Sequence, residues 1–201
     1  MDRHEATSRI GELTGRDIRS LADELGVTVW KDGKLNKGWT GHTIERYLGL
    51  PLNSSRAPNL GSWELKVVSL KRNRQGRLQV KETMWITMID PVEVAEKEFE
   101  DSHLFVKLRR VLVVSRIFES KEEERTLLHG VASFTLEDPD VYGTVKADYD
   151  LVRRTIIEQG FDHLTGYMGE LIQPRTKGRG HGSTSRAFYA RKPFVAKIVG
   201  V

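Results

Sequence analysis

The chain of 201 residues contains no cysteine. This absence excludes disulfide bonds, thiolate-bound zinc or iron–sulfur centres and thiol nucleophiles, so the fold depends on a buried apolar core. Hydrophobic residues make up 38% of the chain, which is enough to form such a core. The length suits a single domain over 1–201, because single cores rarely grow beyond ~250 residues. Any enzymatic nucleophile must be a hydroxyl, a carboxylate, an amine or water.

The apolar residues are not arranged to cross a membrane. The longest apolar runs, such as Val111 to Val114, are far shorter than the ~20 residues that a bilayer requires. The N-terminal segment also lacks the apolar stretch of a signal peptide. We therefore expect a cytoplasmic protein with no membrane partner.

Apolar spacing predicts a mixed α/β fold. Helices are expected over 15–26 and 38–48, which makes the first part of the chain, about 1–50, helical. A loop over 51–61 then leads into a β-hairpin with strands over 62–70 and 78–89, joined by a cationic turn. The remaining expected elements are strands near 110–116 and 131–136, a helix over 145–159, and a strand or short helix over 188–199.

Basic side chains gather at the end of the chain. Residues 171–201 contain seven lysines and arginines and no acid, whereas 90–101 contains six acids and one lysine. Glycines and aromatic residues lie between the cations, a composition typical of segments that contact phosphates through side chains and backbone amides. A solvated basic tail is the alternative.

The segment Glu64-Leu65-Lys66 carries the sharpest chemical signal. On a strand, Glu64 and Lys66 point to the same face, while Leu65 enters the core and offers its backbone carbonyl beside them. A carboxylate can hold a divalent cation, and a nearby ammonium can orient water and offset phosphate charge. Taken alone, however, the pattern also fits an exposed ion pair.

Six sequence blocks, in order along almost the whole chain, place this segment in context. Together they resemble the MutH family of DNA endonucleases, which includes the mismatch-repair nickase and related type II restriction enzymes. The resemblance implies a PD-(D/E)xK restriction-endonuclease-like core, with a mixed central sheet flanked by helices, in one MutH-like domain. The blocks are KGWTGHTIERYLG (37–49), LGSWELK (60–66), ETMW (82–85), SHLFVKLRRVL (102–112), LIQPRTK (171–177) and RAFYARKPF (186–194).

The resemblance implies roles for individual residues. Glu64 and Lys66 look like the Glu and Lys of the family's Asp…Glu-x-Lys motif, with the Leu65 carbonyl as a further metal ligand. Glu45 is similar to the additional acid that supports the metal site. Lys107 looks like the second catalytic lysine, and a strand-edge cation is an equal alternative.

The same resemblance implies a DNA-binding surface at the basic end of the chain, about 171–201. Arg175 and Lys177 resemble the basic pair that reaches the DNA, and Tyr189 resembles the aromatic residue near the recognised base. The further candidates for DNA contact are Lys37, Trp85, Arg179 and Arg186.

One position departs from the family pattern. The family's metal-binding Asp stands seven residues before the motif Glu, where this chain has Ala57, which offers no ligand. An introduced Asp→Ala substitution is the interpretation we favour, because the other presumed site residues are in place; natural loss of cleavage is the alternative. Asn59 offers a carbonyl oxygen, but we expect its use as a ligand to require a rearranged loop.

The function implied is that of a Mg²⁺-dependent, sequence-specific endonuclease acting on double-stranded DNA in a bacterial or archaeal cytoplasm. A type II restriction enzyme is favoured, here disabled at Ala57. The alternatives are a mismatch-repair nickase, a DNA-binding protein that has lost cleavage, and an RNA or structure-specific nuclease. Mn²⁺ is expected to substitute for Mg²⁺, and Ca²⁺ to support binding without cleavage. Double-strand cutting implies a homodimer on DNA, and no small-molecule cofactor is expected.

Overall fold

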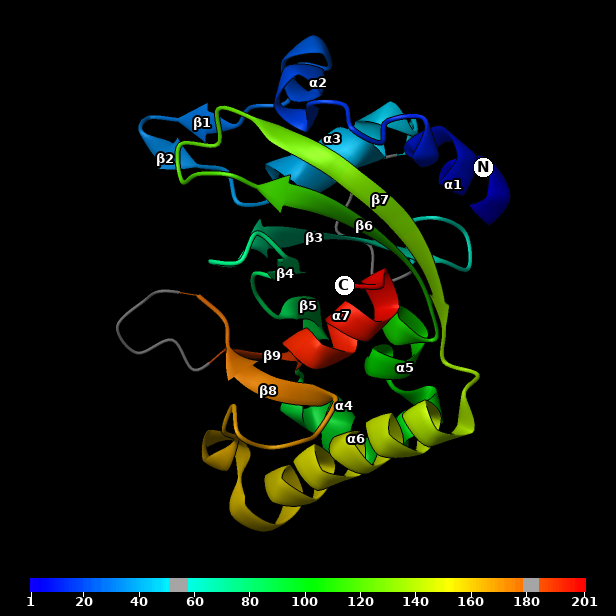
Figure 1. Cartoon of the computed structure of the whole chain (residues 1–201). Helices are drawn as coiled ribbons and strands as arrows, with labels where there is room; N and C mark the ends of the chain where they lie inside the picture. Colours follow the sequence, from blue (N-terminus) through cyan, green and yellow to red (C-terminus); the bar gives the residue numbers. More distant parts are fainter. Residues whose placement is uncertain (51–57, 179–184) are drawn as a thin grey trace. The chain divides into compact units, whose positions relative to one another are not determined.

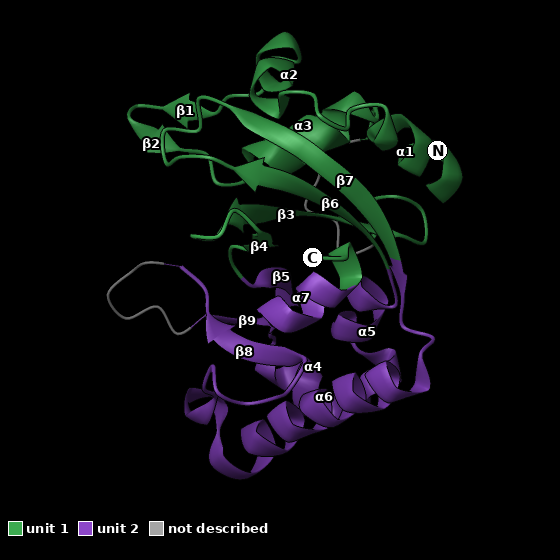
Figure 2. Ribbon diagram, viewed as in Figure 1, with its two compact units in different colours: residues 1–82, 111–133, 198–201 green, residues 83–110, 134–197 purple. Residues whose placement is uncertain are grey.

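The computed structural model describes residues 1–50, 58–178 and 185–201 (Figure 1). These residues divide into two units, which Figure 2 shows in different colours. Unit 1 comprises residues 1–82, 111–133 and 198–201, and unit 2 comprises residues 83–110 and 134–197. The expectation of a single domain, with a helical part at about 1–50 and a basic part at about 171–201, stays a prediction.

The described residues of unit 1 contain a mixed sheet with the strand order β4-β3-β6-β7. Strand β3 pairs antiparallel with β4 and parallel with β6. The parallel pair requires a long crossover, and the chain between β3 and β6 supplies it. The strands are β3 (Glu64–Arg72), β4 (Leu78–Val80), β6 (Arg110–Phe118) and β7 (Thr126–Thr135).

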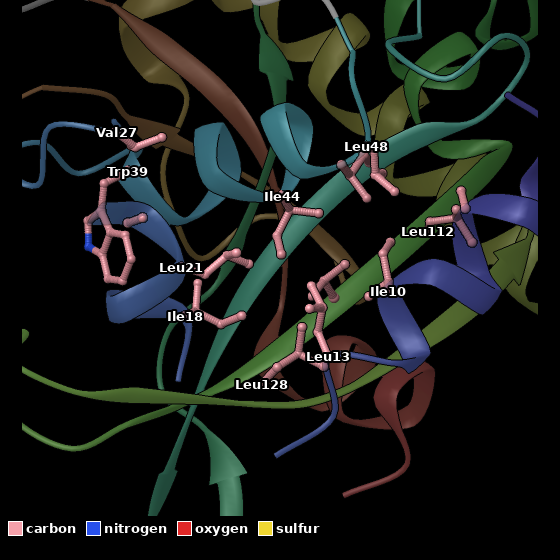
Figure 3. Packing of buried hydrophobic residues seen from close by; sticks show 14 of the residues in the cluster. Ile10, Leu13, Ile18, Leu21, Val27, Trp39, Ile44, Leu48, Leu112 and Leu128 are labelled. Carbon is pink, nitrogen blue, oxygen red and sulfur yellow. The ribbon is translucent and has the colours of Figure 1, made fainter. Parts of the chain in front are cut away.

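Three helices of unit 1 contribute to one apolar cluster with the sheet: α1 (Arg3–Gly11), α2 (Ile18–Glu24) and α3 (Trp39–Tyr47). Their side chains meet residues of β3, β6 and β7, as Figure 3 shows for Ile10, Leu21, Ile44, Leu112 and Leu128. Apolar residues at helical spacing therefore face the sheet. A short hairpin, β1 (Trp30–Lys31) with β2 (Lys34–Leu35), lies between α2 and α3 in the chain.

Unit 2 contains an antiparallel sheet with the strand order β5-β9-β8. Its strands are β5 (Met84–Met88), β8 (Ile172–Thr176) and β9 (Arg186–Ala190). The long helix α6 (Pro139–Gln159) packs here through Tyr149, whose ring contacts those of Phe99 and Phe188. Burial raises the pKa of Tyr149 to about 12. The shorter helices are α4 (Pro91–Glu96), η1 (Phe99–Asp101), α5 (His103–Leu108), η2 (Phe161–His163) and α7 (Lys192–Val199).

The buried carboxylate of Asp148 on α6 binds the backbone N–H groups at the start of β8. The oxygens of Asp148 accept backbone N–H bonds from Glu170, Leu171 and Ile172 at 2.7, 2.8 and 2.9 Å. Gly169 makes the approach possible, because its φ is +78° and an added Cβ would lie 2.0 Å from the Ile172 carbonyl oxygen. Asp148 thus sets the position of the strand that carries Arg175.

The predicted mixed α/β class is confirmed, with a mixed sheet flanked by helices. The single strand expected over 78–89 is wrong. It is divided between β4 and β5, because β4 pairs with β3 whereas β5 pairs with β9, a strand far away in sequence. In the part of the chain that the structure describes, no helix is both long enough and apolar enough to span a membrane.

We predict that Asp148→Ala lowers the free energy of unfolding by about 3 kcal/mol, because three buried or part-buried backbone N–H groups lose a charged acceptor. Urea denaturation followed by circular dichroism measures the change. Asp150→Ala is the matched control, since Asp150 forms a partly exposed ion pair with Lys146 and its loss should cost less than ~1 kcal/mol. Equal losses in the two variants would contradict this role of Asp148.

Candidate active site

The Glu64 and Lys66 side chains lie together at the start of β3. Glu64 Oε1 and Lys66 Nζ are 2.8 Å apart, and the two residues are only 5% and 8% exposed. Residues two apart on a strand share a face, which explains the contact. Leu65 points the other way, into the apolar cluster of unit 1. The arrangement expected from the sequence is present, as a buried rather than an exposed ion pair.

A second acid, Glu45, is joined to the same strand through Asn59. Glu45 lies on α3, and the Asn59 Nδ2 amide donates to its Oε1 at 2.8 Å. Asn59 Oδ1 accepts the backbone N–H of Leu65, also at 2.8 Å. One side-chain amide therefore connects the helix acid to the Glu64-Leu65 peptide. Asn59 lies beside Glu45 and β3, and its oxygen is engaged by the Leu65 N–H, so the expectation that its use as a metal ligand requires a rearranged loop stays a prediction.

The residues present do not fit a tightly held divalent cation. Within residues 1–50, 58–178 and 185–201, no three acidic or histidine side chains come together as metal ligands. The Glu64 carboxylate is paired with an ammonium, and the Glu45 carboxylate accepts an amide N–H. Among the described residues, the Leu65 carbonyl is the further ligand expected from the sequence, and Mg²⁺ and Ca²⁺ favour sites rich in charged oxygen ligands. Ala57 lies outside the described residues.

Lys107 lies on helix α5 in unit 2, so its interpretation as a strand-edge cation is wrong. The helix begins at a side-chain cap, because Ser102 Oγ accepts the N–H of Phe105 at 3.1 Å. The Ser-x-x-Phe spacing places the cap before an apolar turn. Since Glu64 and Lys66 belong to unit 1, cooperation of Lys107 with them stays a prediction.

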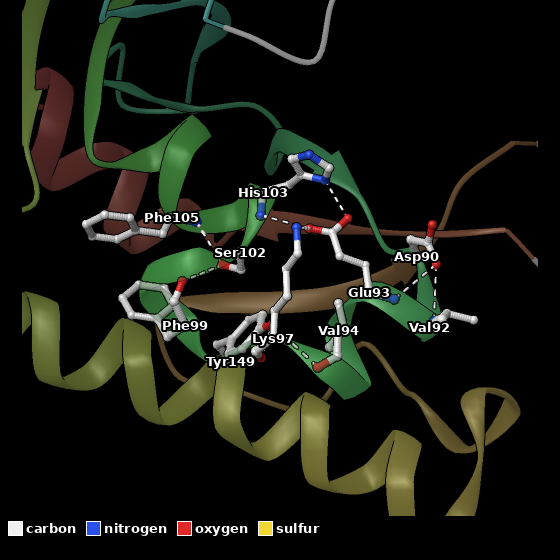
Figure 4. A network of polar contacts seen from close by, with 10 residues as sticks. All are labelled: Asp90, Val92, Glu93, Val94, Lys97, Phe99, Ser102, His103, Phe105 and Tyr149. Carbon is white, nitrogen blue, oxygen red and sulfur yellow. Dashed lines mark hydrogen bonds and ion pairs between the residues drawn. The ribbon is translucent and has the colours of Figure 1, made fainter.

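A polar network fixes the start of α5 (Figure 4). Glu93 on α4 accepts the backbone N–H of His103 at 3.2 Å, and its other oxygen contacts His103 Nδ1 at 2.5 Å. Lys97 contacts Glu93 Oε1 at 3.3 Å. The carboxylate thus binds the first residue of the helix through both backbone and ring, and so positions the segment that carries Lys107.

Four of the predicted DNA contacts form a cationic–aromatic surface on the sheet of unit 2. Lys177 Nζ lies 3.8 Å from the centre of the Trp85 ring, and the Arg175 guanidinium lies 5.7 Å from that of Tyr189. Arg175 also donates to Thr83 Oγ1 at 2.9 Å. Burial lowers the pKa of Lys177 below its usual value.

This surface lies on one face of the sheet. Trp85 is paired with Tyr189 across β5 and β9, and Tyr189 with Gln173 across β9 and β8, so Arg175 shares their face. Phe188 points to the opposite face, where Tyr149 of α6 packs. Trp85 is 37% exposed, so it is not a core residue.

The other predicted DNA contacts are elsewhere or engaged. Arg186 donates to the backbone carbonyls of Phe161 and Asp162, at 3.4 and 3.1 Å, and so holds the turn around η2. Lys37 lies in unit 1 and lines a pocket of about 330 Å³ together with Arg116. Arg116 is opposite Ser69 in the β3–β6 register, whereas Glu64 is opposite Val111, so this pocket is at the other end of β3. Arg179 lies outside the described residues.

Two features of the site were not predicted from the sequence. From the sequence, only the carbonyl oxygen of Asn59 is expected as a possible metal ligand. An amide five residues before Glu64 is, however, close to a carboxylate in shape and size. Glu93 gave no signal, because it stands in an acidic run that suggests a solvated surface.

Comparison with known proteins gives one consistent family. The family model described as DNA mismatch repair enzyme MutH matches residues 48–140. The DNA mismatch repair protein MutH of Haemophilus ducreyi is 27% identical over 209 residues, covering 97% of this chain and 92% of that protein. The MutH protein of Vibrio cholerae is 26% identical over 212 residues, with coverage of 97% and 94%.

Among solved structures, the complex of restriction endonuclease MvaI with its cognate DNA is similar with a TM-score of 0.37 and 13% identity. The match covers 90% of this chain and 95% of that one. The MutH relatives, which match over almost the whole chain, and the family model confirm the resemblance inferred from the six sequence blocks: this chain is similar to MutH proteins.

We predict that Lys66→Met lowers the free energy of unfolding at pH 7 by about 3 kcal/mol, because the buried Glu64 carboxylate loses its ammonium partner. The double variant Glu64→Gln with Lys66→Met should recover at least about half of that loss, since the buried charge is then removed. Chemical denaturation measures both. Lys146→Met, which breaks an exposed pair, is the control. A double variant less stable than Lys66→Met would contradict the prediction.

Proposed function

We propose that this chain is a sequence-specific endonuclease that hydrolyses phosphodiester bonds in double-stranded DNA, and more narrowly a type II restriction enzyme. The observation that carries the proposal is the buried Glu64–Lys66 pair at the start of β3, in the family's motif position. The similarity to MutH proteins over almost the whole chain supports the reaction class. The small number of charged oxygen ligands described above supports a form with weak or no cleavage.

The chemistry requires a water to attack phosphorus in line, so that one P–O bond forms and the bond to the leaving oxygen breaks. Negative charge builds on the phosphoryl oxygens in the transition state. Lys66 is suited to offset that charge, because its ammonium is fixed and poorly hydrated. Glu64 holds Lys66 in one position through their ion pair. For a form of the chain with a complete set of carboxylate ligands, Mg²⁺ is our proposal for the divalent metal, with Mn²⁺ as a substitute.

DNA recognition is assigned to the cationic–aromatic surface formed by Trp85, Arg175, Lys177 and Tyr189. Its cations can contact phosphates or the acceptor edges of guanine, and its rings offer flat faces to bases or sugars. Lys37, Arg179 and Arg186 remain proposed DNA contacts, although Arg186 already bonds to backbone within unit 2. Lys107 remains the proposed second catalytic lysine. A homodimer around a palindromic site is proposed for double-strand cutting.

A mismatch-repair nickase is the second candidate, because relatives that match 97% of this chain are named DNA mismatch repair protein MutH. The number of strands cut separates the two functions. If Ala57→Asp restores cleavage with Mg²⁺, the variant should give linear products from a supercoiled plasmid if the protein is a restriction enzyme, and nicked circles if it is a nickase. Sequencing of the ends would identify the site.

We predict that Arg175→Ala and Lys177→Ala each weaken binding to duplex DNA and reduce the slope of log K against log salt by about 1. Fluorescence anisotropy over a series of KCl concentrations measures both quantities. Arg154→Ala is the matched control, because Arg154 is exposed on α6, which packs on the opposite face of the sheet. Competition with duplex RNA tests the substrate class.

Two results would contradict the proposed function. Equal effects of Arg154→Ala and Arg175→Ala would remove the DNA surface from the sheet of unit 2. Preference for RNA over DNA of the same sequence would move the chain to another class of nuclease.

A further inference from the structure

The position of Asn59 explains why the described residues form no cluster of acidic ligands for a metal ion. Its side chain is half-buried between α3 and β3, and both ends of the amide are used. Nδ2 donates to Glu45 Oε1, and Oδ1 accepts from Leu65 N, each at 2.8 Å. An amide satisfies both contacts, because it carries a donor and an acceptor on one planar group.

A carboxylate of the same shape could not make both contacts unaided. Its second oxygen would face the Glu45 oxygen at hydrogen-bond distance, and two carboxylates this close repel each other unless a proton or a cation lies between them. The Asn59 N–H group therefore takes the place that a cation would have between two carboxylates. Glu64, one residue before Leu65, is on the adjoining strand.

The charge of the site agrees with this view. Glu45, Glu64 and Lys66 together carry a formal charge of −1, which is too little to favour a divalent cation over water. An acid at position 59 would change the formal charge to −2 and add an oxygen ligand. The change would convert an amide–carboxylate contact into a carboxylate pair.

We propose that Asn59 keeps this site free of metal by donating its amide N–H to Glu45, and that Asn59→Asp alone creates a site for one divalent cation. The facing carboxylates of residue 59 and Glu45 would supply its ligands, with the Glu64 carboxylate, one residue before Leu65, as a further candidate. The inference differs from the interpretation of Ala57 as the disabling position. It rests on the proposed endonuclease function only for its cleavage readout.

The first test is Mn²⁺ binding by the DNA-free protein, measured by the loss of the free Mn²⁺ signal in electron paramagnetic resonance. We expect Asn59→Asp to bind one Mn²⁺ at least about tenfold more tightly than the parent chain, a difference of ~1.4 kcal/mol. Asn73→Asp is the control, because it adds the same charge in an exposed turn and should change nothing. Ala57→Asp tests the rival position.

A second measurement keeps the proposal testable if Asn59→Asp is unstable without metal. The facing carboxylates should lower its melting temperature in EDTA, and Mn²⁺ or Mg²⁺ should restore it. Adding Glu45→Gln to Asn59→Asp reverses donor and acceptor, so the double variant should fold without metal and bind none. Circular dichroism follows folding in each case.

The outcomes separate the inference from the proposed function. Mn²⁺ binding by Asn59→Asp without DNA cleavage would support the inference and count against the endonuclease proposal. Binding with cleavage would support both. No gain in binding by a folded Asn59→Asp, a gain by Ala57→Asp alone, or equal binding by the double variant would overturn the inference.

Discussion

The buried pairing of Glu64 with Lys66 is the constraint around which the chemistry of unit 1 is arranged. Two charges of opposite sign are held at 2.8 Å at the start of a strand that pairs on both sides. Neither charge is stable there alone, because desolvation penalises each one strongly. Because β3 begins at Glu64, the Glu64 and Lys66 side chains share one face, and Leu65 points the opposite way into the core.

The two units hold their charged side chains in different ways. Unit 1 packs the face of β3 that carries Leu65 against apolar residues from three helices, which fixes the strand that carries Glu64 and Lys66. Unit 2 presents cations that rest on aromatic rings on one face of a small sheet. Such contacts hold long side chains in place at low cost in rotamer entropy while leaving their N–H groups able to bind phosphate.

Sequence patterns predicted local structure well and long-range pairing poorly. The helices around Ile18 and Ile44 and the strands at Glu64 and Val111 follow from apolar spacing. The division of 78–89 between two sheets does not, because strand pairing depends on β9, which lies about a hundred residues later. The contact of Glu64 with Lys66 could be predicted from strand geometry, whereas Asn59 depended on how a loop returns to α3.

The two hydrogen bonds of Asn59 also affect how readily its side-chain amide is deamidated. Asparagine loses ammonia and becomes an acid when the backbone nitrogen of the following residue attacks the side-chain amide carbon. Here that nitrogen belongs to Leu60, whose N–H is donated to the Trp63 carbonyl at 3.0 Å, and Leu60 itself is buried. Both reaction partners are held in other contacts. Spontaneous ageing of the protein should therefore not convert the amide into a carboxylate, and only a change in the gene would do so.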